Sequence, residues 1–398
     1  MNKRDPSQPR APRGITGSAR RGQVEFENVA LVLQGGGALG AYQAGVYEKL
    51  LEIGVDPTWL AGISIGAINS AIIAGNAREH RVARMREFWE LVSAPGGGFL
   101  GSQFDAWTLP DVQRGWLNQF AAGNVLMQGV PGFFRPRVPS PLLSWNGAGT
   151  SYYDTEPLRG TLERLVDFDR INARETRLSV GAVNVRTGNF AYFDNAVDKI
   201  GPEHIMASCA LPPGFDSVEI DGEHYWDGGM VSNTPLDWVL SACSSLDTLV
   251  LQVDLWSARG QLPTDMASVA TRMKEIQYSS RTRNATDAFR RLEQLRTPFK
   301  QLLALMPAEL AASPQALLLV DELEPALYNI VELVYRSATY EGQYKDFEFS
   351  HRTMTEHWQA GLADATTTFA HQEIFRLPRA EDSPAHYDFL TKPAPVGA

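Results

Sequence analysis

Cysteine is scarce in this chain of 398 residues, which contains only Cys209 and Cys243. Two cysteines cannot form a disulfide framework, and both stand in apolar stretches, which favours small buried residues over metal or redox chemistry. Long hydrophobic runs are also missing, since no stretch approaches the roughly 20 apolar residues that cross a bilayer. Stability must therefore come from a hydrophobic core, for which 44% apolar residues are ample.

Positive charge is scarce outside the N-terminus. The net charge is −10 although the first 22 residues contain six Lys or Arg and one Asp, which leaves about −15 on the remaining chain. An acidic body disfavours a nucleic-acid partner. Residues 1–24 are rich in Pro, Gly and Ser and lack the apolar core of a secretory signal, so we predict a disordered basic tail. This tail is either solvated or an arm that contacts lipid headgroups. We expect a cytoplasmic protein, with peripheral contact to a membrane as an open alternative.

Alternating strand and helix patterns are present after the tail. A short apolar run over 29–34 predicts a buried strand, and a helical pattern follows over 41–54. A second strand over 59–64 is again followed by a helix, which indicates an α/β fold. Further strands are expected up to 248–256, with a hairpin turn at Asp221-Gly222.

The pattern changes near residue 258. Long helical patterns cover 266–305, 316–340 and 350–371. We therefore predict an α/β domain over 25–258 and a helical domain over 259–398. The segment 130–146 is either an insertion packed on its own aromatics or a lid that exposes apolar side chains to lipid. The side chains in question are Phe133, Phe134, Leu142, Leu143 and Trp145.

The stretch "LVLQGGGALG" fits the pattern GxGxxG at Gly35, Gly37 and Gly40. A dinucleotide-binding fold would also need an acidic residue at the end of the second strand. Asp56 precedes that strand and so lies at the wrong end of the sheet, whereas Ser64 occupies the correct end. A nucleotide-binding oxidoreductase is therefore disfavoured.

Ser64 lies at the centre of "GISIG", which is the GxSxG pattern of a nucleophile elbow. The glycines Gly62 and Gly66 leave room for a tight strand-to-helix turn, and the start of the helix favours a developing alkoxide. Parallel strands end at the same edge of a sheet, so the N–H groups of residues 35–37 should lie near Ser64. They then predict an oxyanion hole, in which each donor contributes about 2.7–4 kcal/mol.

The general base is expected to be a carboxylate. None of the seven histidines lies in a recognisable catalytic pattern, and His224 fits an outward strand position. Asp227 stands in "YWDGG" at a strand end and is followed by Gly228 and Gly229. A buried Asp can accept the proton of a serine hydroxyl if desolvation raises its pKa from about 3.9.

The motifs "GGGALG", "GISIG" and "DGG", in this order, resemble those of the patatin-like phospholipase family. The resemblance covers about 25–258, including "ASCALPPGFDSVEIDGEHYWDGGMVSNTPL". It implies a three-layer α/β/α sandwich with a mostly parallel central sheet. The segment "DFEFSHRTMTEHWQAGLADA" is similar to the helical C-terminal extension of a bacterial-type subgroup.

The resemblance also implies roles for particular residues. Ser64 would be the nucleophile of a Ser–Asp dyad with Asp227, without a metal or cofactor, and the N–H of Ile65 would add to the oxyanion hole. Gly35, Gly36 and Gly37 would form the oxyanion hole itself, and the remaining motif glycines are Gly40, Gly62, Gly66, Gly228 and Gly229. Leu39 departs from the family, since many members carry Arg or Lys there.

The sequence thus predicts a serine hydrolase of lipid acyl esters, of the phospholipase A or lysophospholipase type. Its expected partner is a lipid or another acyl ester. An esterase for glycerides or hydroxyacid oligomers is the first alternative, and a lipid-binding module with weak activity is the second.

Overall fold

The computed structural model describes most of the chain. The described residues are 24–93, 111–138, 149–242, 246–280, 326–338, 340–379 and 382–390, with a few positions between 291 and 313. The predictions for the N-terminal tail and for Leu142, Leu143, Trp145 and Cys243 concern residues outside this set.

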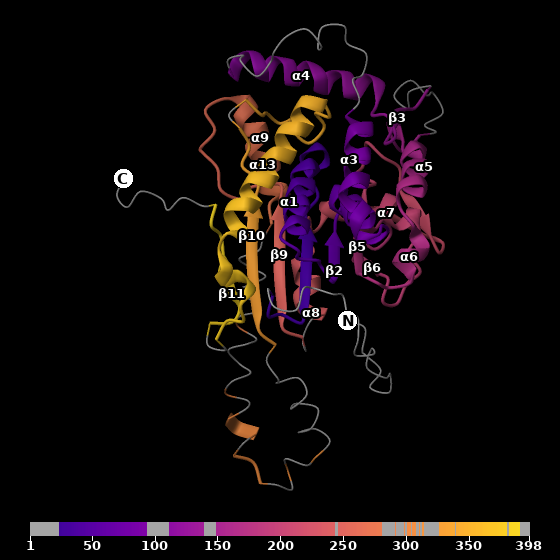
Figure 1. Ribbon diagram of the computed structural model, residues 1–398. Coiled ribbons are helices and arrows are strands. Elements are labelled where there is room, and N and C mark those ends of the chain that lie inside the picture. The colour runs from indigo at the N-terminus through magenta and orange to yellow at the C-terminus, as the bar shows by residue number, and fades with distance from the viewer. Residues whose placement is uncertain are drawn as a thin grey trace.

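The described part is built around one large sheet with the strand order β11-β10-β9-β1-β2-β5-β8-β7, and β6 pairs with β5 (Figure 1). The strands are β1 (Asn28–Leu33), β2 (Trp59–Gly62), β5 (Arg177–Asn184), β6 (Phe190–Asp194), β7 (Val218–Ile220), β8 (Glu223–Asp227), β9 (Thr248–Asp254), β10 (Tyr328–Val334) and β11 (Ala385–Tyr387). The strands from β11 to β5 run parallel, whereas β6, β7 and β8 pair antiparallel. A separate ribbon joins β3 (Arg135–Pro136) to β4 (Tyr153–Asp154). The mostly parallel sheet confirms the predicted fold class.

Helices cover both faces of this sheet. The described helices are α1 (Ala41–Glu52), α2 (Ile65–Ala74), α3 (Arg81–Val92), α4 (Asp111–Gln128), α5 (Glu156–Leu165), α6 (Phe168–Asn172), α7 (Pro202–Ser208), α8 (Leu236–Ala242), α9 (Met266–Tyr278) and α13 (His351–Phe369). The described residues also form the short 3₁₀ helices η1 (Gly37–Gly40), η2 (Arg78–His80), η5 (Gly228–Met230) and η6 (Gln372–Phe375).

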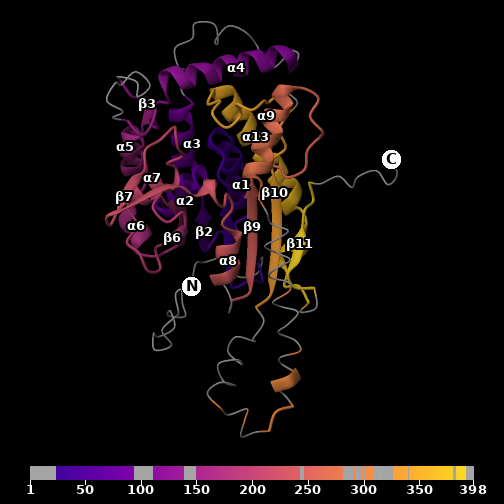
Figure 2. The same cartoon turned by 180° about the vertical axis from the view of Figure 1, so that it is seen from behind.

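The burial pattern of β1 shows why the fold has three layers. Leu31 and Leu33 join the core under α1, α2 and α13, while Ala30 and Val32 join a second core under α8. Successive side chains of a strand point to opposite faces, so a strand that is apolar throughout requires cover on both sides. Figure 1 shows α1 and α13 in front of the sheet, and Figure 2 shows α8 from behind.

The first strand-turn-helix units lie where the sequence predicted them. The strand predicted over 29–34 is β1, and the strand predicted over 59–64 is β2 followed by α2. The hairpin between β7 and β8 has positive φ angles at Asp221 (51°) and Gly222 (81°), as a tight two-residue turn requires.

The helix predicted over 316–340 is wrong for its described part, because residues 328–334 form strand β10. This strand pairs in parallel with β9, and β11 pairs with β10. Residues Tyr328 to Val331 are all buried. A short run that is buried on both faces has no alternation, so its pattern does not separate strand from helix.

The sheet therefore continues across the boundary predicted near residue 258. Helix α13, whose pattern over 350–371 is confirmed, packs directly on α1. The hydroxyl of Tyr42 donates to Asp364 at 2.8 Å, and the indole of Trp358 donates to Glu48. Strands and helices from both sides of the boundary thus share one sheet and one core.

The region between 94 and 150 contains an element that the sequence did not reveal, the long helix α4. Phe133 and Phe134, which a lid would expose, are each only 6% exposed. They pack in an aromatic cluster with Tyr153, Phe215 and Phe349. For these two phenylalanines, the interpretation as an insertion packed on aromatics is confirmed and the lid interpretation is wrong.

Candidate active site

Ser64 occupies a strained turn between β2 and α2. Its φ of 54° and ψ of −123° lie in a region that residues with side chains rarely adopt. A Cβ on Gly62 would lie 2.3 Å from the carbonyl oxygen of Gly66, and a Cβ on Gly66 would lie 2.2 Å from that of Leu33. The turn is therefore compatible only with glycine on each side, and it leaves Ser64 partly exposed at the carboxyl end of the parallel strands.

The strained backbone is held by Ser208, which the sequence analysis did not single out. The N–H of Ser64 donates to Oγ of Ser208 at 2.9 Å, and this hydroxyl donates to the carbonyl oxygen of Gly181 at 2.7 Å. Ser208 is completely buried at the end of α7. It links three segments that are far apart in sequence, so no local pattern could have marked it.

Asp227 ends β8 beside Ser64 and is only 3% exposed. Burial raises the pKa of Asp227 to about 7, against the lowering effect of hydrogen bonding with the Ser64 side chain and with the N–H of Gly229. The Gly229 N–H donates to Oδ1 at 2.7 Å. A carboxyl group with this pKa is ionised for about half of the molecules at neutral pH, which suits a general base.

The thiol of Cys209 lies at the same place, beside the Ser64 side chain and within range of the charge of Asp227. Burial raises the pKa of Cys209 well above its usual range, and the charge of Asp227 raises it further, while hydrogen bonding with Ser64 lowers it. The thiol is therefore neutral and serves as a small packing group, as predicted for this residue.

The first glycine motif forms a loop over residues 34–40, here named the glycine loop. A Cβ on Gly35 would lie 3.2 Å from Cβ of Ser64, so the loop runs directly beside the serine. The N–H of Gly35 donates to the carbonyl oxygen of Asn233 at 3.2 Å and is buried. By contrast, no acceptor among the described residues takes the N–H of Gly36, Gly37 or Ile65. These three donors all precede or begin helical turns, where backbone N–H groups have no partner within the helix.

Gln34 anchors the glycine loop to β9. Its Oε1 accepts the N–H groups of Leu255 (2.6 Å) and Trp256 (2.9 Å), and its Nε2 donates to Oγ1 of Thr234 and to the carbonyl oxygen of Tyr278. Every polar atom of this buried amide is thereby used. The sequence showed Gln34 only as the end of a strand.

Asn233 holds the loop from the other side. Its Nδ2 donates to the carbonyl oxygens of Gly35 (3.0 Å) and Tyr278 (2.8 Å). Nearby, burial raises the pKa of Asp254, at the end of β9, to about 7, and the charge of Glu332 raises it as well. The Nε2 of Gln252 donates to this carboxyl at 2.7 Å.

Leu39, the departure from the family motif, is completely buried in the main core. Gly40 lies against Ile65, since a Cβ there would come within 2.5 Å of its side chain. A cation at position 39 would lie buried in this apolar core, so the apolar residue is explained by packing. The position belongs to the core rather than to the surface of the site.

The histidines do not complete a triad. His224 is exposed on β8, where its Nδ1 lies 3.1 Å from Oγ of Ser217. Among the described residues, no histidine hydrogen-bonds to Ser64 or Asp227. In the described part of the chain there is likewise no cluster of three or more His, Cys, Asp or Glu that could hold a metal ion.

Comparison with known families identifies the family to which the chain belongs. A family model described as patatin-like phospholipase matches residues 31–240, which is more than half of the chain and includes Ser64 and Asp227. The chain belongs to the patatin-like phospholipase family. A second model, described as patatin phospholipase, matches residues 276–381. Membership of the family supports lipid acyl hydrolase activity, with a lipid as substrate.

Individual relatives add little to this assignment. The structure of VipD from Legionella pneumophila is similar with 16% identity and a TM-score of 0.35, covering 86% of this chain and 67% of that one. The comparison with curated proteins found no match. Among the described helices of this patatin-like phospholipase, none is long and apolar enough to cross a membrane.

Proposed function

We propose that the protein hydrolyses lipid acyl esters with a Ser64–Asp227 dyad and without a metal or organic cofactor. The observation that carries the proposal is the pairing of a serine on a strained elbow with a buried carboxylate whose pKa is about 7. Both groups lie at the carboxyl end of the sheet, beside a loop with unused N–H donors. The family assignment supports the same chemistry.

The reaction follows from these positions. Asp227 accepts the proton of the Ser64 hydroxyl while the Ser64 oxygen attacks the ester carbonyl. The N–H groups of Gly36 and Gly37 donate to the resulting oxyanion, and Ile65 at the start of α2 adds a third donor. The leaving alcohol takes the proton from Asp227, and water activated by the same carboxylate then releases the fatty acid from Ser64.

In this proposal Gly35 does not donate to the oxyanion, although the sequence analysis included its N–H among the donors. Its N–H already donates to Asn233, so Gly36 and Gly37 supply the donors from this loop. Gly35 instead provides space, because a side chain there would meet both Asn233 and Ser64.

The decisive experiment compares hydrolysis of phospholipid, lysophospholipid, glyceride and short acyl esters by the wild type, Ser64→Ala and Asp227→Asn. We expect both variants to lose at least about 10³-fold in kcat, because each removes a group that acts in the chemical step. His224→Ala is the matched control and should retain activity. Full activity of Ser64→Ala would refute the proposal, and the preferred ester decides between a phospholipase and an esterase for other lipids.

We also propose that the protein contacts its substrate at a membrane surface through the outer face of α4. Trp116 (71%), Phe120 (68%) and Met127 (78%) are exposed along one side of this helix. The other side is bound to the C-terminal region: Arg114 pairs with Glu356, and further hydrogen bonds join Gly115 to Tyr344 and Asn118 to Arg352. Figure 1 shows α4 lying across the end of the molecule above α9 and α13.

The charge of α4 suits an uncharged lipid surface. Residues 115–128 contain no Asp, Glu, Lys or Arg, and the chain as a whole is acidic. Attraction to anionic headgroups is therefore unavailable on this face, and insertion of aromatic and aliphatic side chains is the source of affinity.

A further inference from the structure

The C-terminal region contacts the glycine loop directly at Ala38, the residue that follows the proposed oxyanion donors. The N–H of Ala38 donates to the carbonyl oxygen of Asp346 at 2.8 Å. The carbonyl oxygen of Ala38 accepts from Nδ1 of His357 on α13 at 3.4 Å. Both backbone polar groups of this residue are thus bound by residues more than 300 positions away in the sequence.

Gly37 shows how closely the two segments approach. Its φ is 55°, and a Cβ at this position would lie 2.1 Å from the carbonyl oxygen of Asp346. A side chain at residue 37 would therefore displace the C-terminal segment as well as strain the loop. The contact between the C-terminal segment and the glycine loop is therefore made by backbone atoms on both sides.

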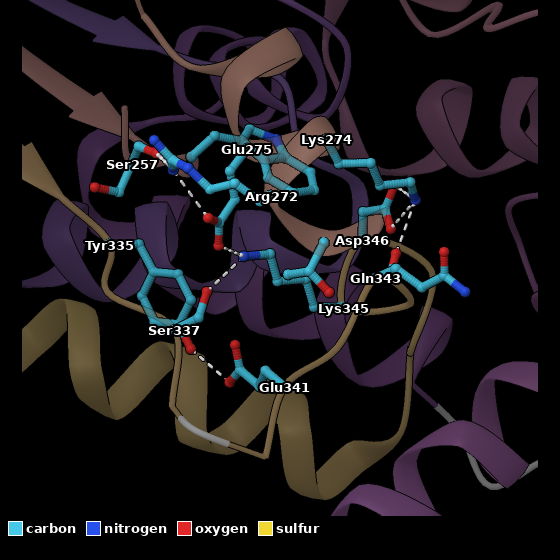
Figure 3. A network of polar contacts seen from close by, with 12 residues as sticks. Ser257, Arg272, Lys274, Glu275, Tyr335, Ser337, Glu341, Gln343, Lys345 and Asp346 are labelled. Atoms are coloured by element: carbon cyan, nitrogen blue, oxygen red, sulfur yellow. Dashed lines mark hydrogen bonds and ion pairs between the residues drawn. The ribbon is translucent and has the colours of Figure 1, made fainter. Parts of the chain in front are cut away.

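Asp346 is itself fixed in place by α9. Both carboxylate oxygens of Asp346 lie 2.8 Å from Nζ of Lys274, which also donates to the carbonyl oxygen of Gln343 at 2.9 Å (Figure 3). The ammonium group thereby closes the turn that presents the Asp346 carbonyl to Ala38. The Lys274 side chain is 29% exposed, so it can be changed without opening the core.

A second ion pair holds the same turn next to Lys274. The Nζ of Lys345 lies 2.9 Å from Oε1 of Glu275 and 2.7 Å from Oγ of Ser337, and Figure 3 shows this pair beside the first. Glu275 also accepts from Arg272 at 3.1 Å. Lys345 and Asp346 are therefore tied to two consecutive residues of α9.

His357 is oriented by Glu341. Its Nε2 lies 3.2 Å from Oε1 of Glu341, which also accepts from the hydroxyl of Tyr335 at 2.6 Å. Each ring nitrogen of His357 thus faces an acceptor, so both must carry a hydrogen for the two bonds to exist together.

We propose that Lys274, Asp346 and His357 form a C-terminal clamp that positions the oxyanion hole through Ala38. The inference rests on the function proposed above and assigns to these three residues a positioning role, without contact to the substrate. A loop with three consecutive glycines has unusual conformational freedom. Oxyanion donors act only when they are preorganised, so the freedom of this loop must be removed by contacts from outside it.

The test compares kcat and KM for a soluble ester in variants of the clamp. In Lys274→Met/Asp346→Asn the ion pair is removed without leaving an unpaired charge, and we expect kcat to fall about 10- to 100-fold with KM changed by less than about threefold. Inhibition by a trifluoromethyl ketone, which forms a tetrahedral adduct on the serine, should weaken by the same factor as kcat. Lys274→Arg keeps the ion pair and should restore most of the rate.

The matched control is Tyr42→Phe, which removes a hydrogen bond between α1 and α13 that does not reach the glycine loop. It should leave kcat unchanged, whereas His357→Met should lower kcat as the ion-pair variant does. Folded clamp variants with the kcat of the wild type would overturn the proposal. A loss that Tyr42→Phe reproduces would also overturn it, since it would reflect general stability.

Hydrogen–deuterium exchange separates this proposal from the proposed function. The peptide covering residues 34–40 should exchange faster in the clamp variants and at the wild-type rate in Tyr42→Phe. This readout does not require turnover, so unchanged exchange refutes the clamp even in a protein that hydrolyses no ester. A wild type without hydrolase activity but with faster exchange in the variants would refute the hydrolase function alone.

Discussion

At the scale of single residues, the proposed mechanism makes the activation of Ser64 depend on the charge of Asp227. Only the ionised carboxylate can accept the serine proton, and burial raises its pKa to about 7. We therefore expect kcat/KM for a soluble ester to rise about tenfold per pH unit below pH 7 and to level off above it. The measurement is a pH–rate profile, with thermal unfolding followed at each pH to separate loss of fold from loss of charge.

Asp254 provides the control for this profile, because its pKa is also about 7. Asp254→Asn should keep the midpoint of the wild type, since its carboxyl contacts Gln252, Thr234 and Ser280 rather than Ser64. A flat profile between pH 5 and 9, or a midpoint that moves in Asp254→Asn, would contradict the assignment of Asp227 as the base.

The candidate site residues that could be predicted from the sequence are those marked by a local pattern. Ser64 and Asp227 are marked by neighbouring glycines, and the structure places them side by side. Ser208, Asn233 and Asp346 could not be predicted, because each acts on the backbone of a residue far away in the chain. Any polar residue can make such a bond, so its type carries no signal.

At the scale of elements, α4 and β10 are two that the sequence patterns did not predict correctly. Helix α4 contains glycines and few charges, so its apolar face did not stand out in a segment without clear order. Strand β10 lies inside the sheet and is apolar on both faces, so its sequence fits a helix as well. The elements that pack against each segment decide whether it forms a helix or a strand, and a local sequence pattern does not show these tertiary contacts.

The exposed face of α4 gives a prediction at this scale. In Trp116→Ser/Phe120→Ser, two aromatic side chains lose their apolar surface, and we expect binding to phosphatidylcholine vesicles to fall at least about tenfold. Hydrolysis of vesicle lipid should fall further than hydrolysis of a short soluble ester. Vesicle co-sedimentation measures the first effect and fatty-acid release the second.

The control for α4 is Val197→Ser, which removes an equally exposed apolar side chain (80%) in the turn after β6. It should bind vesicles like the wild type. Because residues 115–128 are uncharged, adding anionic lipid should change binding little. Unchanged vesicle binding in the double variant, or binding that depends on anionic lipid alone, would rule out α4 as the membrane contact.

At the scale of the whole molecule, the division at residue 258 predicts that a fragment ending there could fold alone. The structure favours the opposite outcome, because β10 pairs along the full length of β9 and α13 covers α1. We expect the fragment 1–258 to be insoluble or unfolded, since it exposes a sheet edge and the apolar face of α1. Circular dichroism and thermal unfolding of the fragment provide the measurement.

A chain ending at residue 390 is the matched control for this truncation, because it retains every strand and helix of the described structure. It should unfold in a single transition like the full chain. A soluble 1–258 fragment with its own cooperative transition would support two independent domains. It would also weaken the C-terminal clamp, since the site would then form without residues 346 and 357.

The two buried carboxyls at the end of the sheet have a further consequence, which concerns proton linkage. Asp227 and Asp254 have pKa values of about 7 in the folded protein, well above the usual value of about 3.9 for Asp. The folded chain therefore binds these protons more tightly than the unfolded chain, and stability decreases as the pH rises from about 4 to about 7. Above that range each group costs on the order of a few kcal/mol of folding free energy. The proposed base Asp227 thus becomes ionised over the same pH interval in which its ionisation destabilises the fold, so the proposed hydrolysis would proceed on the less stable side of this titration.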